Sequence, residues 1–139
     1  MKTGIMKKDN LIKDASDIGI AIVPETNENE ETNWIVYFFN FKETPIENVL
    51  INASASGVVD GVEKETATVR FHIEKLGPLS YRKIEAVLPE ALRINNRYWV
   101  SYYEGKEIFE KKFIIAADTN IPDNFMMVPF INKPGLLVQ

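Results

Sequence analysis

The stretch 34-WIVYFFNF-41 is apolar on both faces and rich in aromatic and β-branched side chains. Such residues favour extended backbone. A strand with two apolar faces is either covered on both sides or meets a partner with its second face. We therefore expect residues 34–41 to form a central strand of a β-sheet.

Shorter runs on both sides of this stretch alternate between apolar and polar residues, which is typical of half-buried strands. Together they predict strands over residues 18–22, 34–41, 48–56, 66–73, 81–88, 97–103 and 106–116. Asp60-Gly61 and Glu104-Gly105 favour tight hairpins, because the central positions of such turns need positive φ. In the last strand the apolar parity shifts at Lys111-Lys112, which predicts a bulge.

Short strands separated by turn signals predict an all-β fold, namely an immunoglobulin-like two-sheet antiparallel β-sandwich of about seven strands. A partly open barrel is the alternative, because the alternation does not reveal strand order. The two tryptophans, Trp34 and Trp99, are expected to anchor the core. The disulfide of antibody domains cannot form, since the chain has no cysteine.

The 139 residues suit one domain flanked by two different segments. Residues 1–16 are polar and charged and predict a flexible N-terminal arm, whereas residues 17–117 carry the sandwich pattern. Residues 118–139 contain too much apolar surface for a free tail, so we expect them to pack on the sandwich or on a partner chain. Pro134-Gly135 suits the centre of a type II turn.

Charge and composition argue against several classes of partner. The net charge is −4 and no basic stripe is visible, so we expect no nucleic-acid partner. No run approaches the ~20 apolar residues that span a bilayer, so we expect no membrane partner. The absence of cysteine and of an apolar N-terminal stretch predicts a cytoplasmic protein.

Signals for catalysis, metals and cofactors are weak. His72 is the single histidine and lies on the polar side of its strand, which indicates an exposed side chain. The carboxylates form no recognisable pair, the acidic loop 25–32 lacks the spacing of a calcium loop, and no glycine-rich phosphate loop is present. We expect no catalytic residue, no metal site and no cofactor.

Aromatic and methionine side chains are the remaining candidates for a site. They could form an exposed platform for a partner protein or a sugar, because aromatic rings give large contact area at small entropic cost. The alternative is that they fill the core and pair across strands. The candidate binding residues are Tyr37, Phe39, Phe41, Tyr98, Tyr102, Tyr103, Phe125, Met127 and Phe130.

Several segments from residue 17 onward together resemble a family of short bacterial proteins that are often named as the alpha or beta subunit of phenylalanyl-tRNA synthetase. The segments are Asn33-Trp34, Thr44–Leu50, Lys83–Glu85, Asn96–Tyr103, Lys111–Phe113 and Asn132–Gly135. The resemblance implies a link to aminoacylation but brings no active-site residues with it. The arginines of a class II synthetase ATP site, which lie on a helix-flanked sheet, have no counterparts here.

Two functions of different classes follow from these observations. The first is a non-catalytic module that binds a partner protein or associates with itself, for example as a homodimer; the apolar stretch 34–41 and the segment 118–139 favour it. The second is an appendage of an aminoacylation system, which the resemblance implies, or a small enzyme that uses carboxylates.

Overall fold

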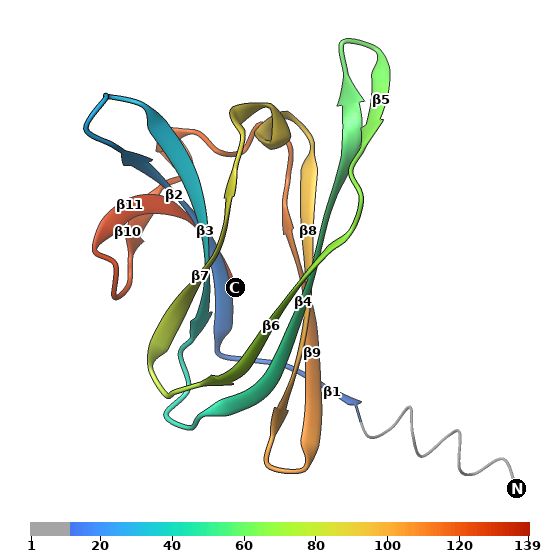
Figure 1. The fold of residues 1–139 in the computed structure, drawn as a ribbon, viewed down its shortest axis with the longest axis vertical. Coiled ribbons are helices and arrows are strands. Elements are labelled where there is room, and N and C mark those ends of the chain that lie inside the picture. Colours follow the sequence, from blue (N-terminus) through green and yellow to red (C-terminus); the bar gives the residue numbers. More distant parts are fainter. Residues whose placement is uncertain (1–11) are drawn as a thin grey trace, which may run out of the picture.

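The computed structural model describes residues 12–139. Within this range the chain is all-β and forms two sheets, of six and five strands, which face one another as two layers (Figure 1). Residues 1–11, which make up most of the predicted arm 1–16, lie outside the described residues. The rest of that segment contributes the short strand β1 (Ile12–Asp14).

The five-stranded sheet has the order β10-β11-β2-β3-β7. Its strands are β2 (Ile18–Thr26), β3 (Thr32–Asn40), β7 (Ser80–Val87), β10 (Met126–Val128) and β11 (Lys133–Val138). The apolar stretch 34–41 lies mostly in β3, which has β2 on one side and β7 on the other. All neighbours in this sheet are antiparallel.

The six-stranded sheet has the order β1-β9-β8-β4-β5, with β6 also paired to β4. Its other strands are β4 (Ile46–Val59), β5 (Val62–Glu65), β6 (Val69–Leu76), β8 (Asn95–Glu104) and β9 (Glu107–Ile115). Because β1 runs parallel to β9, this sheet is mixed and the expectation of a purely antiparallel fold is wrong. Two short 3-10 helices, η1 (Pro89–Arg93) and η2 (Pro122–Asn124), lie in the connections.

The expected count of about seven strands is too low. The seven predicted runs correspond to β2, β3, β4, β6, β7, β8 and β9, and β1, β5, β10 and β11 are additional. Those four are only three to six residues long, and strands this short carry little alternation. The hairpin at Asp60-Gly61 is confirmed, with φ of 52° and 77°, and it projects beyond the two layers (Figure 1).

The main core lies between the sheets. Its largest fully buried side chains include Phe38 of β3, Tyr98 and Tyr102 of β8, and Phe113 of β9. Trp34 is partly buried and packs against this core. Trp99 does not, and the expectation that it anchors the core is wrong. It is 45% exposed, because Tyr98 and Val100 take the inward positions of β8.

The C-terminal segment 118–139 adds strands to the chain's own fold. β11 pairs with β2, and a second apolar cluster that includes Phe39 and Val128 forms on the side of the five-stranded sheet away from the main core. The expected type II turn centred on Pro134-Gly135 is wrong, since both residues lie within β11 opposite Met127 and Met126. Gly135 instead allows close approach: a Cβ there would lie 2.7 Å from the carbonyl oxygen of Ile22.

Candidate functional site: the open face of the six-stranded sheet

The outer side of the six-stranded sheet carries polar and charged side chains in register. One cross-strand row runs Lys112, Trp99, Asn52 and Arg70, from β9 through β8 and β4 to β6. The bulge expected at Lys111-Lys112 is wrong, because β8 and β9 pair without a shift of register from Asn96 to Glu104. The unbroken register is what sets Lys112 beside Trp99.

A second row follows two residues along the same strands, as strand alternation requires. It contains Ile114, Arg97 and Ser54. These two rows, with Thr68, line a hollow of about 850 Å³ that we call the open face. Its defining residues are Asn52, Ser54, Arg70, Arg97, Trp99 and Lys112.

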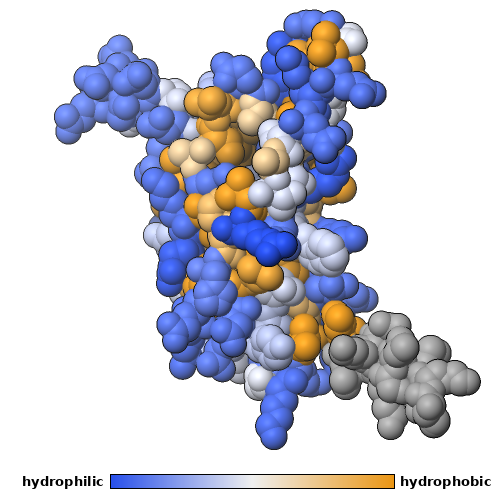
Figure 2. All heavy atoms as spheres, turned by 45° about the vertical axis from the view of Figure 1, so that its right-hand side comes forward, coloured by the Kyte–Doolittle hydropathy of each residue, from blue (hydrophilic) through white to orange (hydrophobic). Residues whose placement is uncertain are grey.

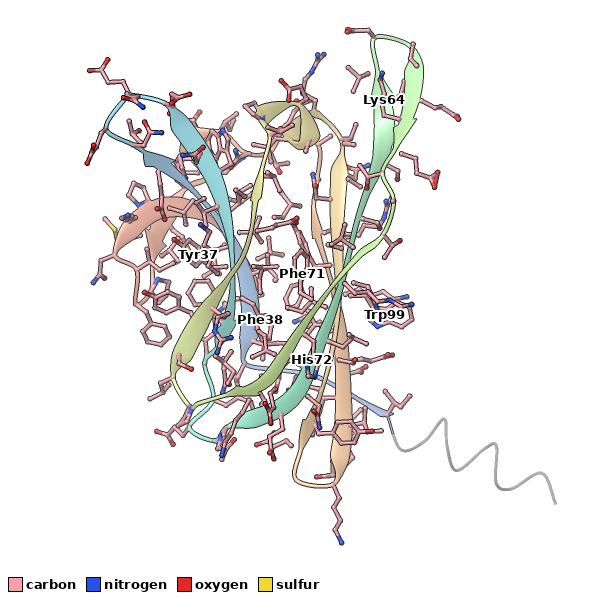
Figure 3. All side chains as sticks on the ribbon, viewed as in Figure 1. Tyr37, Phe38, Lys64, Phe71, His72 and Trp99 are labelled. Carbon is pink, nitrogen blue, oxygen red and sulfur yellow. The ribbon has the colours of Figure 1, made fainter. Side chains whose placement is uncertain are left out.

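Trp99 lies at the middle of the open face. In Figure 3 it points away from the sheet, whereas Phe38 and Phe71 lie between the layers and Tyr37 lies on the far side of the five-stranded sheet. The Lys112 ammonium is 4.6 Å from the centre of the Trp99 ring, within cation–π range. The indole N–H donates to Glu110 Oε1 at 3.3 Å. These contacts hold a large ring in place while it remains open to a partner.

Positive charge gathers around this ring. Arg70, Arg97 and Lys112 all line the hollow, although the whole chain carries a net charge of −4. The Arg97 guanidinium donates to Ser56 Oγ at 2.6 Å, which orients one side of its planar fork. The open face therefore attracts anionic groups, and two guanidinium groups can each hold a carboxylate with paired hydrogen bonds.

One hydrogen-bonding atom of the open face has no partner. The side-chain oxygen of Asn52 is buried beside Trp99 and Arg70 and accepts no hydrogen bond within residues 12–139. A buried acceptor without a donor costs free energy.

The surface seen in Figure 2, where the right-hand side of Figure 1 comes forward, mixes hydrophilic and hydrophobic residues rather than presenting one apolar patch. Such a mixture is typical of interfaces that form and dissociate, whereas permanent interfaces are more apolar. The hollow lies across the strands of a sheet, so it offers area to an extended partner.

A second, smaller feature lies at one end of the layers. A pocket of about 230 Å³ is bounded by β4, β7, β8 and η1, and Glu85 and Tyr98 both line it. The Tyr98 hydroxyl donates to Glu85 Oε2 at 3.0 Å. Burial raises the pKa of Glu85 above its ordinary value, against the opposing effect of that hydrogen bond. Burial, with the nearby carboxylate, also raises the pKa of the Tyr98 hydroxyl.

Four of the candidate binding residues are buried in the two apolar clusters and serve as core side chains. They are Tyr37, Phe39, Tyr98 and Tyr102. Burial raises the pKa of Tyr102 to about 12, and burial with a hydrogen bond to Glu25 raises that of Tyr37. Phe41 and Phe125 are partly buried, and Phe125 packs edge-on against Trp34. None of these six side chains is as exposed as that of Trp99.

The other three candidates, Tyr103, Met127 and Phe130, are exposed. The structure brings Phe130 together with Phe39 and Phe41, at ring-centre distances of 6.4 and 5.8 Å. It places Tyr103 on a different sheet from Met127. The nine candidates therefore do not form one platform.

Sequence reasoning missed the residues of the open face. A signal was available on β8, because strand alternation puts Arg97 and Trp99 on one face and Tyr98 and Val100 on the other. Both parities contain an aromatic residue, so alternation alone did not reveal which side faces solvent. His72 is exposed on β6, two positions from Arg70.

No protein-family model matches the chain, and no curated protein matches it. No helix within residues 12–139 is both long and apolar enough to span a bilayer. The same range contains no group of three or more histidine, cysteine or carboxylate side chains arranged to hold a metal ion.

Proposed function

We propose that this chain is a non-catalytic protein-interaction module that binds an acidic segment of a partner protein on its open face. The observation that carries the proposal is the row Lys112–Trp99–Asn52–Arg70, in which two cations, an exposed indole and an unsatisfied acceptor share one side of a sheet. Tryptophan and arginine are the residue types that most often dominate binding energy at protein interfaces.

An immunoglobulin-like sandwich is the scaffold that we propose for this module. The strands β2, β3 and β7 lie in one sheet and β9, β8, β4 and β6 in the other, so among these seven strands the chain crosses between sheets after β3, β6 and β7. This arrangement parallels the division of strands in immunoglobulin domains, except that the fourth strand, β6, lies beside the third, β4. Domains of this kind bind partners through sheet faces and loops while the core stays rigid.

A peptide fits the open face better than a nucleic acid does. A few carboxylates on a short segment suffice for Arg70 and Arg97. A long polyanion would meet Glu110 beside the indole and the net negative charge of the chain. Base stacking also relies on exposed aromatic side chains. Tyr98 and Phe113 also line the hollow but are buried, which leaves Trp99 as its exposed ring among residues 12–139.

The test measures binding of a fluorescent peptide rich in Asp and Glu by anisotropy. Trp99→Ala and the double variant Arg70→Ser/Arg97→Ser are each expected to weaken binding by about tenfold or more. Added salt should weaken binding to the wild type. The matched control, Lys64→Ser/Arg82→Ser, removes two exposed cations from β5 and β7, away from the open face, and should leave affinity unchanged.

Equal loss of affinity in the control and in the open-face double variant would contradict the proposal, because net charge alone would then explain binding. Tighter binding of a single-stranded oligonucleotide than of the peptide would contradict the choice of partner. Sedimentation of the purified protein belongs to the same experiment. A dimer that the open-face variants dissociate would make a second copy of the chain, rather than another protein, the partner.

A further inference from the structure

The small pocket at the end of the layers goes beyond the proposed interaction face. It opens on the inner side of β4, where Ala53 and Ala55 point inward, and it is closed by Ala91 of η1. Short side chains at these positions leave space that larger residues fill elsewhere in the core. The volume of about 230 Å³ is ample for a small ligand.

Glu85 lines this pocket from β7. Its carboxylate accepts a hydrogen bond from Tyr98, yet it forms no ion pair with any lysine or arginine within residues 12–139. A partly buried carboxylate without a cation is costly to keep ionised, which is consistent with its raised pKa. The pocket thus contains a negative group with no charge to balance it.

Three of the polar side chains that line the pocket already use their hydrogen-bond donors. The Asn96 amide donates to the carbonyl oxygens of Ala91 and Ile94 at 2.7 and 3.0 Å. The Thr66 hydroxyl accepts from the Ala55 N–H at 2.8 Å and donates to the Ala55 carbonyl. The Tyr98 hydroxyl is committed to Glu85. An incoming ligand therefore meets an acceptor and apolar walls, with few donors to receive an anion.

We propose that this pocket binds a small primary alkylammonium ion, with the ammonium group on the Glu85 carboxylate and the alkyl chain against Ala53, Ala55 and Ala91. An ammonium supplies the missing charge and donates to the carboxylate, and the alanine side chains remove the alkyl chain from water. A carboxylate of the same length would be repelled. A neutral alcohol would leave the charge on Glu85 unbalanced.

The test uses amide NMR titrations of the full chain at neutral pH with n-butylammonium, n-butanol and butyrate. We expect saturable shifts of amides in β4, β7 and η1 with n-butylammonium, and binding weaker by about tenfold or more for the two other compounds. Glu85→Gln should weaken the binding of n-butylammonium by about tenfold or more, because glutamine keeps the shape of the side chain and removes its charge. Ala91→Leu should block the pocket without touching the carboxylate.

The matched control is Glu63→Gln, which removes an exposed carboxylate from β5 and should bind like the wild type. Circular dichroism of each variant establishes that it is folded. The proposal is overturned if n-butanol or butyrate binds as tightly as n-butylammonium, if Glu85→Gln binds unchanged, or if no saturable shift occurs at millimolar ligand. None of these results bears on the open face, so the two proposals fail separately.

Discussion

Replacing Gly135 by alanine is the sharpest test of how the C-terminal segment is held. Gly135 lies in β11, next to Leu136, which pairs with Ile22 of β2. An added Cβ would lie 2.7 Å from the carbonyl oxygen of Ile22, 2.9 Å from Val23 Cγ2 and 3.1 Å from Val128 Cγ2. The nearest of these atoms belongs to the backbone of a central strand, so it cannot move aside without disturbing the sheet.

The size of the effect follows from two opposing contributions. Forcing one carbon into a packed site costs about 1–3 kcal/mol. Replacing glycine by alanine restricts the unfolded chain and returns about 0.4–1 kcal/mol. The free energy of unfolding should therefore fall by roughly 1–2 kcal/mol, which corresponds to a melting temperature lower by roughly 3–8 °C for a chain of this size.

Urea and thermal unfolding of Gly135→Ala, followed by circular dichroism, measure this loss. Gly77→Ala is the matched control, because an added Cβ there would meet only Ser80 Oγ at 3.9 Å. That variant should be as stable as the wild type or slightly more so. Binding of a hydrophobic dye should increase for Gly135→Ala alone, since loosening β11 uncovers Phe39 and its neighbours. If both variants melt at the wild-type temperature, the close packing of β11 on β2 is refuted.

Three further predictions concern single residues. Burial raises the pKa of Glu85, which faces Tyr98, in the folded state. The stability that the protonated Glu85 contributes is therefore complete below the unfolded-state pKa and is lost as pH rises through the folded-state pKa. Thermal melts should therefore show Glu85→Gln more stable than the wild type at neutral pH but not at acidic pH, and a constant difference across pH would contradict the shift. Leu79→Asn should raise the free energy of unfolding by about 0.5–1 kcal/mol in urea titrations, because the exposed Leu79 has a φ of 48° that asparagine adopts more readily. A fall in the free energy of unfolding would contradict this backbone conformation. Asn40→Ala should lower the free energy of unfolding by about 2–4 kcal/mol in the same assay. The fully buried Asn40 side chain donates to the carbonyl oxygens of Thr44 and Gly77 and accepts from the Lys42 N–H. A loss below about 1 kcal/mol would show that water replaces these hydrogen bonds.

Much of the secondary structure was predictable because its determinants are local. Alternation of period two depends on neighbouring residues, so the seven longer strands and the hairpin at Asp60-Gly61 could be placed from the sequence. The parallel pairing of β1 and the addition of β11 beside β2 could not be placed, since both join residues far apart along the chain.

The candidate site was less predictable for the same reason. Glu85 belongs to β7 and Tyr98 to β8, and the two meet only because these strands lie in facing layers. Arg70, Asn52 and Lys112 come from three different strands and reach Trp99 through the register of the sheet. The list of candidate aromatics included residues that the two cores bury, because apolar rings suit a core and an interface alike.

The sequence by itself determined that this protein is built from strands, roughly where the seven longer ones lie, and that its C-terminal residues must be covered. Only the tertiary structure decided which side of β8 faces water, that Gly135 serves a close approach rather than a turn, and that a carboxylate lines an inner pocket. The physical reason is that alternation separates the two faces of a strand, whereas the identity of the buried face depends on which other strands pack against it.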